Sequence, residues 1–303
     1  MVGDTGAASE FETHRPRLFS LAYRMLGSAG EAEDAVQDAY LRWSAADRSV
    51  IETPVAWLTK VVTNLCVNRL TSARVRRERY AGPWLPEPVL TDGAAPLGPM
   101  ETAEQRESVS LALLTLMERL TPAERAVFVL REAFGYGHRE TAGILGVSED
   151  GSRQLHRRAR QRLAEDRRRF DPSRERWAEV VERFLAAAQG GDLRGLEELL
   201  AEDVVAWSDG GGKVSAARRP VVGRDRVVRY FGGWMRFVTP EYELRVVEVN
   251  GMPALLALRA GAPVGVLVCE VAGGGVAAVR TVANPDKLGY LARQLGSRPR
   301  TWR

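Results

Sequence analysis

Three consecutive glycines followed by a lysine, in the stretch WSDGGGKV at residues 207–214, have the composition of a loop that binds a nucleotide phosphate. A P-loop places a glycine five residues before the glycine of its Gly-Lys pair, and a Ser or Thr directly after the lysine. Trp207 and Val214 occupy those two positions, so the sequence excludes a P-loop. The stretch lies between two β-rich runs, and its glycines favour the positive φ angles of a hairpin.

Arginine is concentrated in two other stretches, RLTSARVRRERY at residues 69–80 and RQLHRRARQRLAEDRRR at residues 153–169. The net charge is only +4, but the calculated pI is about 9.3. Grouped arginines produce a positive surface that suits a polyphosphate such as nucleic acid. The alternative is an ordinary solvated helix face, and composition does not decide between the two.

The cysteines and histidines are too scattered to predict a metal site or a disulfide framework, and we expect no cofactor. We expect Cys66 and Cys269 to be buried as small hydrophobic residues. The N-terminal stretch lacks the apolar core of a secretory signal, and no apolar run reaches the ~20 residues of a membrane helix. The 303 residues therefore predict a soluble, cytoplasmic protein, long enough for two domains.

Residues 10–80 have the periodicity of helices that must position the first arginine stretch. In EAEDAVQDAYLRW, at residues 31–43, the apolar residues form one helix face, and Ser28 with Glu31 forms a capping box. The next helix is predicted to begin at Thr53-Pro54. Its polar face comprises Lys60, Thr63, Asn64, Asn68 and Arg69, and runs into Arg74, Arg76 and Arg77.

The second arginine stretch belongs to a predicted helix-turn-helix. A helix begins at Thr121-Pro122, and residues 138–163 then have a short helix, a turn at Gly146, a Ser148 cap and a longer basic helix. The start of that second helix would face base edges in a major groove, and its later arginines would meet phosphates. The candidates for base edges are Glu149, Ser152, Arg153, Gln154, His156 and Arg157, and those for phosphates are Arg158, Arg160 and Arg162.

Residues 81–100 are rich in Pro and Gly and predict a linker, although Trp84 and Leu85 within it are expected to be docked on protein. After Pro172 two amphipathic helices are followed by short β-rich runs, with a helical piece near 223–237. Helices followed by a run of antiparallel strands predict an α+β arrangement. The expected strands are 203–208, 214–222, 242–249, 253–260, 264–272 and 276–283.

Three motifs together resemble the extracytoplasmic-function sigma factors of RNA polymerase. EDAVQDAYLRW and TPVAWLTKVVTNLCVNRLTSARVRRE are similar to sigma region 2, and LTPAERAVFVLREAFGYGHRETAGILGVSEDGSRQLHRRARQRL is similar to region 4. The resemblance implies two all-α sigma domains, a helical bundle and a helix-turn-helix, in a multidomain chain. We expect region 2 at 10–80, a linker at 81–100, region 4 at 101–170 and an α+β extension at 173–303.

The resemblance also implies roles for particular residues. The core-polymerase contact would be made by Asp34, Gln37, Asp38 and Arg42. The minus-ten promoter element would be bound by Lys60, Asn64, Asn68, Arg69, Arg74, Arg76 and Arg77. The minus-35 element would be read by Arg139, Ser148, Glu149, Ser152, Arg153, Gln154, His156, Arg157, Arg158 and Arg160.

The C-terminal part resembles SnoaL-like domains, in which a curved sheet and helices form a cone. PWLPEP, DGGGK and NPDKL, at 83–88, 209–213 and 284–288, resemble motifs of the SigJ-type group of sigma factors that carries this extension. The resemblance implies an extension that regulates the sigma domains in place of a separate anti-sigma protein. The expected regulatory contacts are Trp84, Leu85, Pro86, Asp209, Lys213, Asn284, Asp286 and Lys287.

Two readings of function stay open at this point. The favoured one is a sigma factor, not an enzyme, with core RNA polymerase and promoter DNA as partners and no membrane contact. The other is a DNA-binding regulator fused to a sensing or enzymatic domain. In that case Asp209 or Asp286 could act as an acid or base with a raised pKa. A small-molecule ligand of the extension also stays open, and contact with protein is favoured over it.

Overall fold

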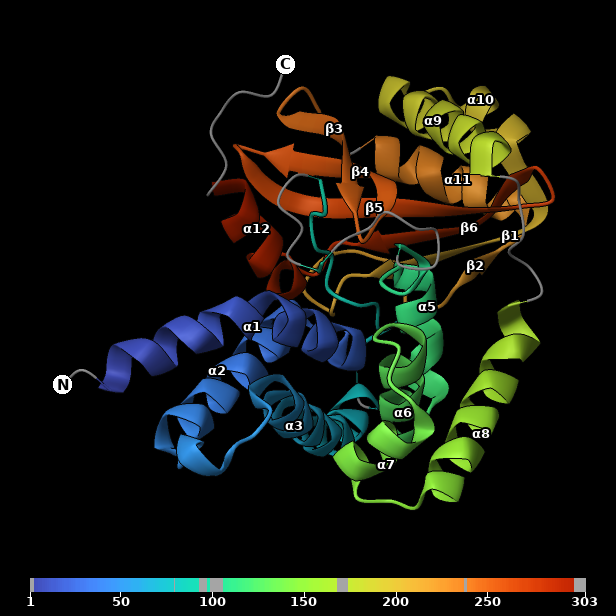
Figure 1. Ribbon diagram of the computed structural model, residues 1–303. Helices are drawn as coiled ribbons and strands as arrows, with labels where there is room; N and C mark the ends of the chain where they lie inside the picture. Colours follow the sequence, from blue (N-terminus) through green and yellow to red (C-terminus); the bar gives the residue numbers. More distant parts are fainter. Residues whose placement is uncertain are drawn as a thin grey trace. The chain divides into compact units, whose positions relative to one another are not determined.

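The computed structural model describes residues 3–78, 80–92, 97–98, 106–167, 174–236 and 239–296 (Figure 1). The chain forms two units: residues 1–78 together with 93–166, and residues 79–92 together with 167–303. Segment 79–92 therefore belongs to the C-terminal unit, although in the sequence it lies between the two helical stretches of the first. None of the described helices is both long and apolar enough to cross a membrane.

The described part of the first unit is built from helices. Their bounds are α1 Gly3–Leu26, α2 Ala29–Ala45, a 3-10 turn Arg48–Val50, α3 Pro54–Glu78, α5 Leu111–Leu116, a 3-10 turn Met117–Arg119, α6 Pro122–Glu132, α7 His138–Leu145 and α8 Glu149–Arg167. The predicted helix starts are confirmed. The Ser28 hydroxyl accepts the Glu31 N–H at the start of α2, and Thr121 with Glu124 forms a reciprocal capping box at α6.

Helix α3 is covered on more sides than its sequence pattern predicts. It packs against α1 and α2, and also against α6 and α7. Thr63, predicted on the polar face, is fully buried, so that prediction is wrong. Trp57, predicted to be buried, keeps part of its surface exposed. A helix between two layers does not have the single apolar stripe on which the prediction depended.

The C-terminal unit is an α+β domain. Its elements are α9 Arg174–Gly190, α10 Leu193–Leu199, β1 Leu200–Asp209, β2 Val221–Val222, α11 Arg224–Met235, β3 Tyr242–Val249, β4 Met252–Arg259, β5 Ala262–Ala272, β6 Gly275–Val282, a 3-10 turn Pro285–Lys287 and α12 Gly289–Gly296. The six strands form one sheet in the order β2-β1-β6-β5-β4-β3. Helices α9 and α11 cover one of its faces (Figure 1), where Phe184, Phe231 and Cys269 lie in the apolar core.

Two predictions about the strands are wrong. Strands β1 and β6 are parallel and not antiparallel. The chain passes from β1 through α11 and strands β3 to β5 before it enters β6, and β6 then runs beside β1 in the same direction. The run 214–222 contributes only Val221–Val222 to the sheet, and the residues before it form a loop instead of a tight hairpin. The remaining strands, β3 to β6, lie where the sequence predicts them to within about two residues.

Linker residues extend this sheet beyond β3. Leu90 forms an antiparallel bridge with Val249, and the Thr91 N–H donates to the Glu248 carbonyl at 3.0 Å. The Asn250 N–H donates in turn to the Val89 carbonyl at 2.9 Å. Leu85, Val89 and Leu90 are buried, and the predicted docking of the linker is confirmed.

Candidate functional site

The predicted polymerase face lies on the outer side of α2. Asp34, Gln37 and Arg42 are exposed and Asp38 is half-buried. Ala32, Ala35, Val36, Ala39 and Trp43 occupy the buried side of the same helix. A period of 3.6 residues therefore separates an apolar face from an acidic and polar face that is open to a partner.

Arg69 of α3 connects this face to the predicted minus-ten surface. Its guanidinium lies 2.6 Å from the Asp38 carboxylate and 3.9 Å from that of Asp34, and it also donates to the Glu31 carbonyl at 2.9 Å. Arg69 is thus partly engaged within the protein. On the rest of the predicted surface Lys60 and Asn68 are exposed and Asn64 is half-buried. The side chains of Arg74, Arg76 and Arg77 lie outside the described residues.

The helix-turn-helix has the predicted geometry. Gly146 ends α7 with φ of 70°, a left-handed conformation that glycine adopts without strain. The Ser148 hydroxyl accepts the Gly151 N–H at 3.0 Å and caps α8. The exposed residues that could reach DNA are Arg139, Gln154, Arg157, Arg158 and Arg160. Arg153 is exposed as well, but it pairs with Glu149 and Asp150 in the first turn of its own helix.

Two predicted base-reading residues point into the protein. Ser152 is fully buried, and its hydroxyl lies 3.1 Å from Nδ1 of His138, so the prediction that it reads a base is wrong. Ser152 continues the buried stripe of Ala159 and Leu163, and this helical spacing could have revealed it from the sequence. The His156 side chain is only 13% exposed and lies 2.7 Å from the Glu132 carboxylate. The structure therefore does not place it on the open face of α8.

The regulatory residues converge on one buried carboxylate, that of Asp209 at the end of β1. Asp209 is fully buried and accepts hydrogen bonds from the Tyr80 hydroxyl at 2.5 Å and the Leu85 N–H at 2.8 Å. It also accepts the Gly211 N–H at 3.1 Å and the Lys287 ammonium at 2.6 Å. With four donors committed to it, this carboxylate is a structural acceptor and is not free to act as an acid or base.

Lys287 closes the same cluster from the NPDKL side. Its ammonium donates to the Leu85 carbonyl at 2.5 Å and lies 4.1 Å from the ring centre of Trp84 and 4.8 Å from that of Tyr80. A cation against two aromatic faces and a carboxylate is stabilised in low-dielectric surroundings. We call Tyr80, Trp84, Leu85, Asp209, Asn284 and Lys287 the latch.

Tyr80 is the latch residue that the sequence analysis missed. Its hydroxyl donates to Asp209 and accepts from the Asn284 amide at 2.7 Å. Burial, together with the hydrogen bond to Asp209, raises the pKa of this phenol well above its usual value, so it stays a donor. Tyr80 closes the basic stretch at the end of the predicted region 2, and its position directly before the linker is the one signal that the sequence offered.

The three glycines each make room for a neighbour. A Cβ on Gly210 would lie 2.7 Å from the Val214 carbonyl oxygen, and one on Gly211 would lie 2.3 Å from the Asn284 amide. A Cβ on Gly212 would lie 3.1 Å from Ala81 of the linker. Gly211 and Gly212 also have φ of 60° and 72°. The glycines thus allow the loop to close on itself, on the NPDKL turn and on the linker.

The remaining predicted contacts lie beside the latch. Lys213 pairs with Asp286 at 2.6 Å, and both side chains are more than half exposed. Pro86 is buried next to Leu85. Farther along the linker, the Gln294 side chain of α12 accepts the Leu90 N–H at 2.9 Å and donates to the Leu90 carbonyl at 3.0 Å. The structure therefore brings together all three motifs and adds Tyr80 and Gln294 to them.

Comparisons with known proteins agree with this division of the chain. Residues 11–76 match the model of sigma-70 region 2, residues 110–163 that of sigma-70 region 4, and residues 181–283 that of the SnoaL-like domain. The ECF RNA polymerase sigma factor SigJ of Mycobacterium tuberculosis is 40% identical over 293 residues, which cover 92% of each chain. A probable ECF RNA polymerase sigma factor of the same organism, SigI, is 34% identical over 95% of this chain and 97% of its own.

The solved structures give the same relationship. The crystal structure of M. tuberculosis SigJ matches with a TM-score of 0.73 at 38% sequence identity, and covers 93% of this chain and 98% of that one. The structural similarity therefore extends over nearly the whole chain, across both sigma regions and the SnoaL-like extension. The chain belongs to the extracytoplasmic-function sigma factors of RNA polymerase, in the form that carries a SnoaL-like C-terminal extension.

Proposed function

We propose that this chain binds core RNA polymerase through the outer face of α2 and directs initiation at particular promoters. The exposed residues of α3 would bind the minus-ten element, and the exposed face of α8 would read the minus-35 element. The protein would act with polymerase in the cytoplasm and have no catalytic activity of its own. The observation that carries the proposal is the presence of both sigma regions in one chain, together with a sigma-factor relative that matches over 92% of each chain.

The latch gives the extension a way to regulate the sigma regions. The chain between the two regions runs through 80–92, and this segment is embedded in the C-terminal unit by the latch and by Gln294. The two promoter-binding helices are joined along the chain by this segment, so the contacts that hold it limit how far they can separate. We therefore assign the extension the role of holding the linker, which restrains the sigma regions and also supports them.

Charge reversal tests polymerase binding. Asp34 is the better target, because it is 75% exposed and lies 3.9 Å from Arg69, whereas Asp38 holds Arg69 at 2.6 Å. Asp34→Lys should weaken capture of core polymerase by about tenfold or more. Glu197→Lys, an equal charge change on the exposed side of α10, should leave capture unchanged. Wild-type affinity in Asp34→Lys would remove the α2 face from the proposal.

Truncation tests regulation in transcription with purified core polymerase. Removal of residues 292–303 deletes Gln294 and should raise promoter-directed output, because the linker then has one anchor fewer. Removal of residues 173–303 should lower output, because Leu85, Val89 and Leu90 lose the surface that buries them. Unchanged output from both truncations would contradict the regulatory role. Failure of the intact chain to bind core polymerase would instead favour a DNA-binding regulator fused to a sensing or enzymatic domain.

A further inference from the structure

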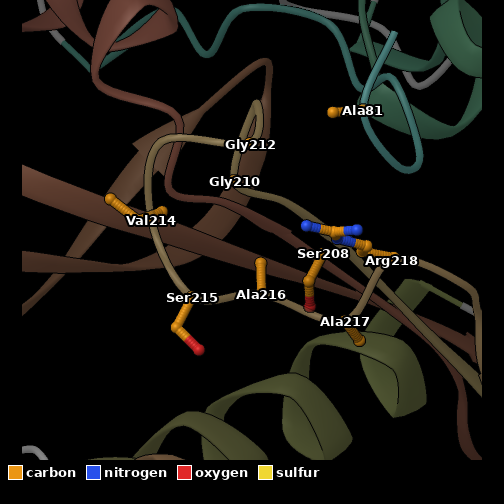
Figure 2. A pocket seen from close by; sticks show the side chains of 9 residues that line it. All are labelled: Ala81, Ser208, Gly210, Gly212, Val214, Ser215, Ala216, Ala217 and Arg218. Atoms are coloured by element: carbon orange, nitrogen blue, oxygen red, sulfur yellow. The ribbon is translucent and has the colours of Figure 1, made fainter.

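A small polar hollow lies under the glycine loop, directly beside the latch. Its volume is about 180 Å³, and it is lined by Ser208 at the end of β1, by the loop from Gly210 to Arg218, and by Ala81 of the linker. Figure 2 shows the loop arched around the hollow, with the guanidinium group of Arg218 reaching in beside Ser208. Its lining is mostly polar, unlike the apolar core between the sheet and helices α9 and α11.

The charge of the hollow is positive. Arg218 is the one charged residue in its lining; it is exposed to solvent, and within the described residues it makes no ion pair or hydrogen bond. The nearby charges are already committed: Lys213 pairs with Asp286, and the Asp209 carboxylate accepts four donors in the latch. Nothing in the described lining neutralises Arg218, so an anion is the ligand that this charge favours.

The other lining groups add hydrogen-bonding capacity and set a size limit. Ser208 and Ser215 provide hydroxyls, and the Ser208 hydroxyl is held in place by that of Tyr230 at 2.7 Å. Pockets for drug-sized ligands have volumes of about 300–1,000 Å³, so this hollow is smaller than any of them. This is too small for a nucleotide or a drug-sized molecule, but it accommodates a carboxylate or phosphate group with a short substituent.

The walls of the hollow are also parts of the regulatory contact. Ala81 follows Tyr80, and the Gly212 position lies close to it, since a Cβ there would come within 3.1 Å of the Ala81 Cβ. Gly82 lies against the backbone of Arg218: a Cβ on Gly82 would be 3.6 Å from the Arg218 Cα. Gly210 follows Asp209 directly. A ligand in the hollow would therefore touch the linker and the loop together.

We propose that this hollow binds a small oxyanion, carboxylate or phosphate, through Arg218 and the Ser208 and Ser215 hydroxyls, and that the bound anion stabilises the docked linker. Occupancy and linker attachment are then coupled, and each favours the other. The effect of the bound anion on transcription rests on the proposed function, but anion binding itself does not.

Binding is measured on the full chain without polymerase, by isothermal titration with inorganic phosphate and, separately, with acetate. Wild-type protein should bind at least one probe at a single site. Arg218→Gln should weaken binding about tenfold or more, because it removes both the charge and the fork of donors. Arg219→Gln makes the same change at the next residue, which is exposed like Arg218 but does not line the hollow, and should stay within about twofold of wild type.

Hydrogen exchange of residues 80–92 supplies the second readout. The probe that binds should slow exchange of these amides in wild type and in Arg219→Gln, but not in Arg218→Gln. The proposal would be overturned if neither probe bound at millimolar concentration. It would also be overturned if the two arginine variants weakened binding equally. Binding without slower exchange would overturn the coupling. All these outcomes are independent of polymerase, so they are distinct from a failure of the proposed function.

Discussion

Asp209→Asn and Asp286→Asn make the same chemical change in two Lys–Asp pairs that join the same two motifs. In both pairs the shortest distance from nitrogen to oxygen is 2.6 Å. The side chains of Lys287 and Asp209 are 8% and 0% exposed, whereas those of Lys213 and Asp286 are 54% and 62% exposed. Distance and residue type are matched, so the two pairs differ in burial and in the hydrogen bonds that Asp209 also accepts from Tyr80 and Leu85 of the linker. Both differences predict that Asp209→Asn loosens the linker far more than Asp286→Asn does.

The expected magnitudes differ by more than a factor of ten. Removing one partner of a buried pair costs about 3–5 kcal/mol, because the other charge stays buried without compensation. Asp209→Asn would leave the Lys287 ammonium buried without its carboxylate, facing only the Leu85 carbonyl and two aromatic rings. An exposed pair contributes only about 0–1 kcal/mol. With tenfold for each 1.4 kcal/mol, these figures become roughly a hundredfold or more for Asp209→Asn, and about fivefold or less for Asp286→Asn.

The assay is hydrogen exchange of the linker amides in the full chain. The Leu85 N–H donates to Asp209 itself, so a peptide that contains it reports directly on the latch. Faster exchange by about a hundredfold in Asp209→Asn, with little change in Asp286→Asn, is the expected result. Similar acceleration in both variants would refute the reasoning from burial and direct linker contact, and no acceleration in either would show that the latch does not hold the linker.

Three further predictions follow from other features of the structure. Gly211→Ala should destabilise the loop by more than ~1 kcal/mol in thermal unfolding, because its Cβ would meet Asn284 at 2.3 Å, whereas Gly233→Ala, with open space in helix α11, should be neutral or stabilising. Substituting Gln for Arg157, Arg158 or Arg160 should reduce the slope of log affinity against log salt for promoter DNA by ~0.9 for each phosphate that the variant no longer neutralises, and buried Ser152→Ala should not change it. Burial, with Arg131, His156 and Arg153 nearby, lowers the pKa of His138 from 6.5, so the unfolded chain binds that proton more tightly. Stability should then fall as the pH drops from about 6.5 toward the lower folded-state pKa, and His138→Asn should flatten that part of the curve.

Local signals explain most of what the sequence could predict. Caps at Ser28, Thr121 and Ser148 and the glycine turn at Gly146 act within one helical turn, so their sequence pattern was sufficient. The positions of β3 to β6 followed from short β-rich runs for the same reason. The three motifs of the latch were also recognised, but through their resemblance to a family and not through a physical signal between residues more than seventy positions apart.

The errors occurred where a neighbour from a distant part of the chain decides the outcome. The prediction that Thr63 lies on a polar face holds only for a helix covered on one side, and α6 and α7 cover α3 on a second side. Ser152 is the exception, because its stripe with Ala159 and Leu163 is a local pattern that already indicates burial. The parallel pairing of β1 with β6 and the place of Tyr80 both depend on tertiary contacts that no local pattern contains.

The chemistry of the linker contact suits attachment that can be reversed. Apolar burial by Leu85, Val89 and Leu90 provides a general attraction, but the positions along the chain are set by polar partners: Asp209 and Lys287 at Leu85, Asn250 at Val89 and Gln294 at Leu90. A buried ion pair stabilises little compared with a hydrophobic replacement of the same shape, yet it strongly disfavours any register that leaves one charge alone. Such an arrangement holds the linker in one register. Once one partner is removed, the charge left behind strongly destabilises the docked linker. A purely apolar groove would tolerate slippage and release gradually, whereas the latch should release as a unit.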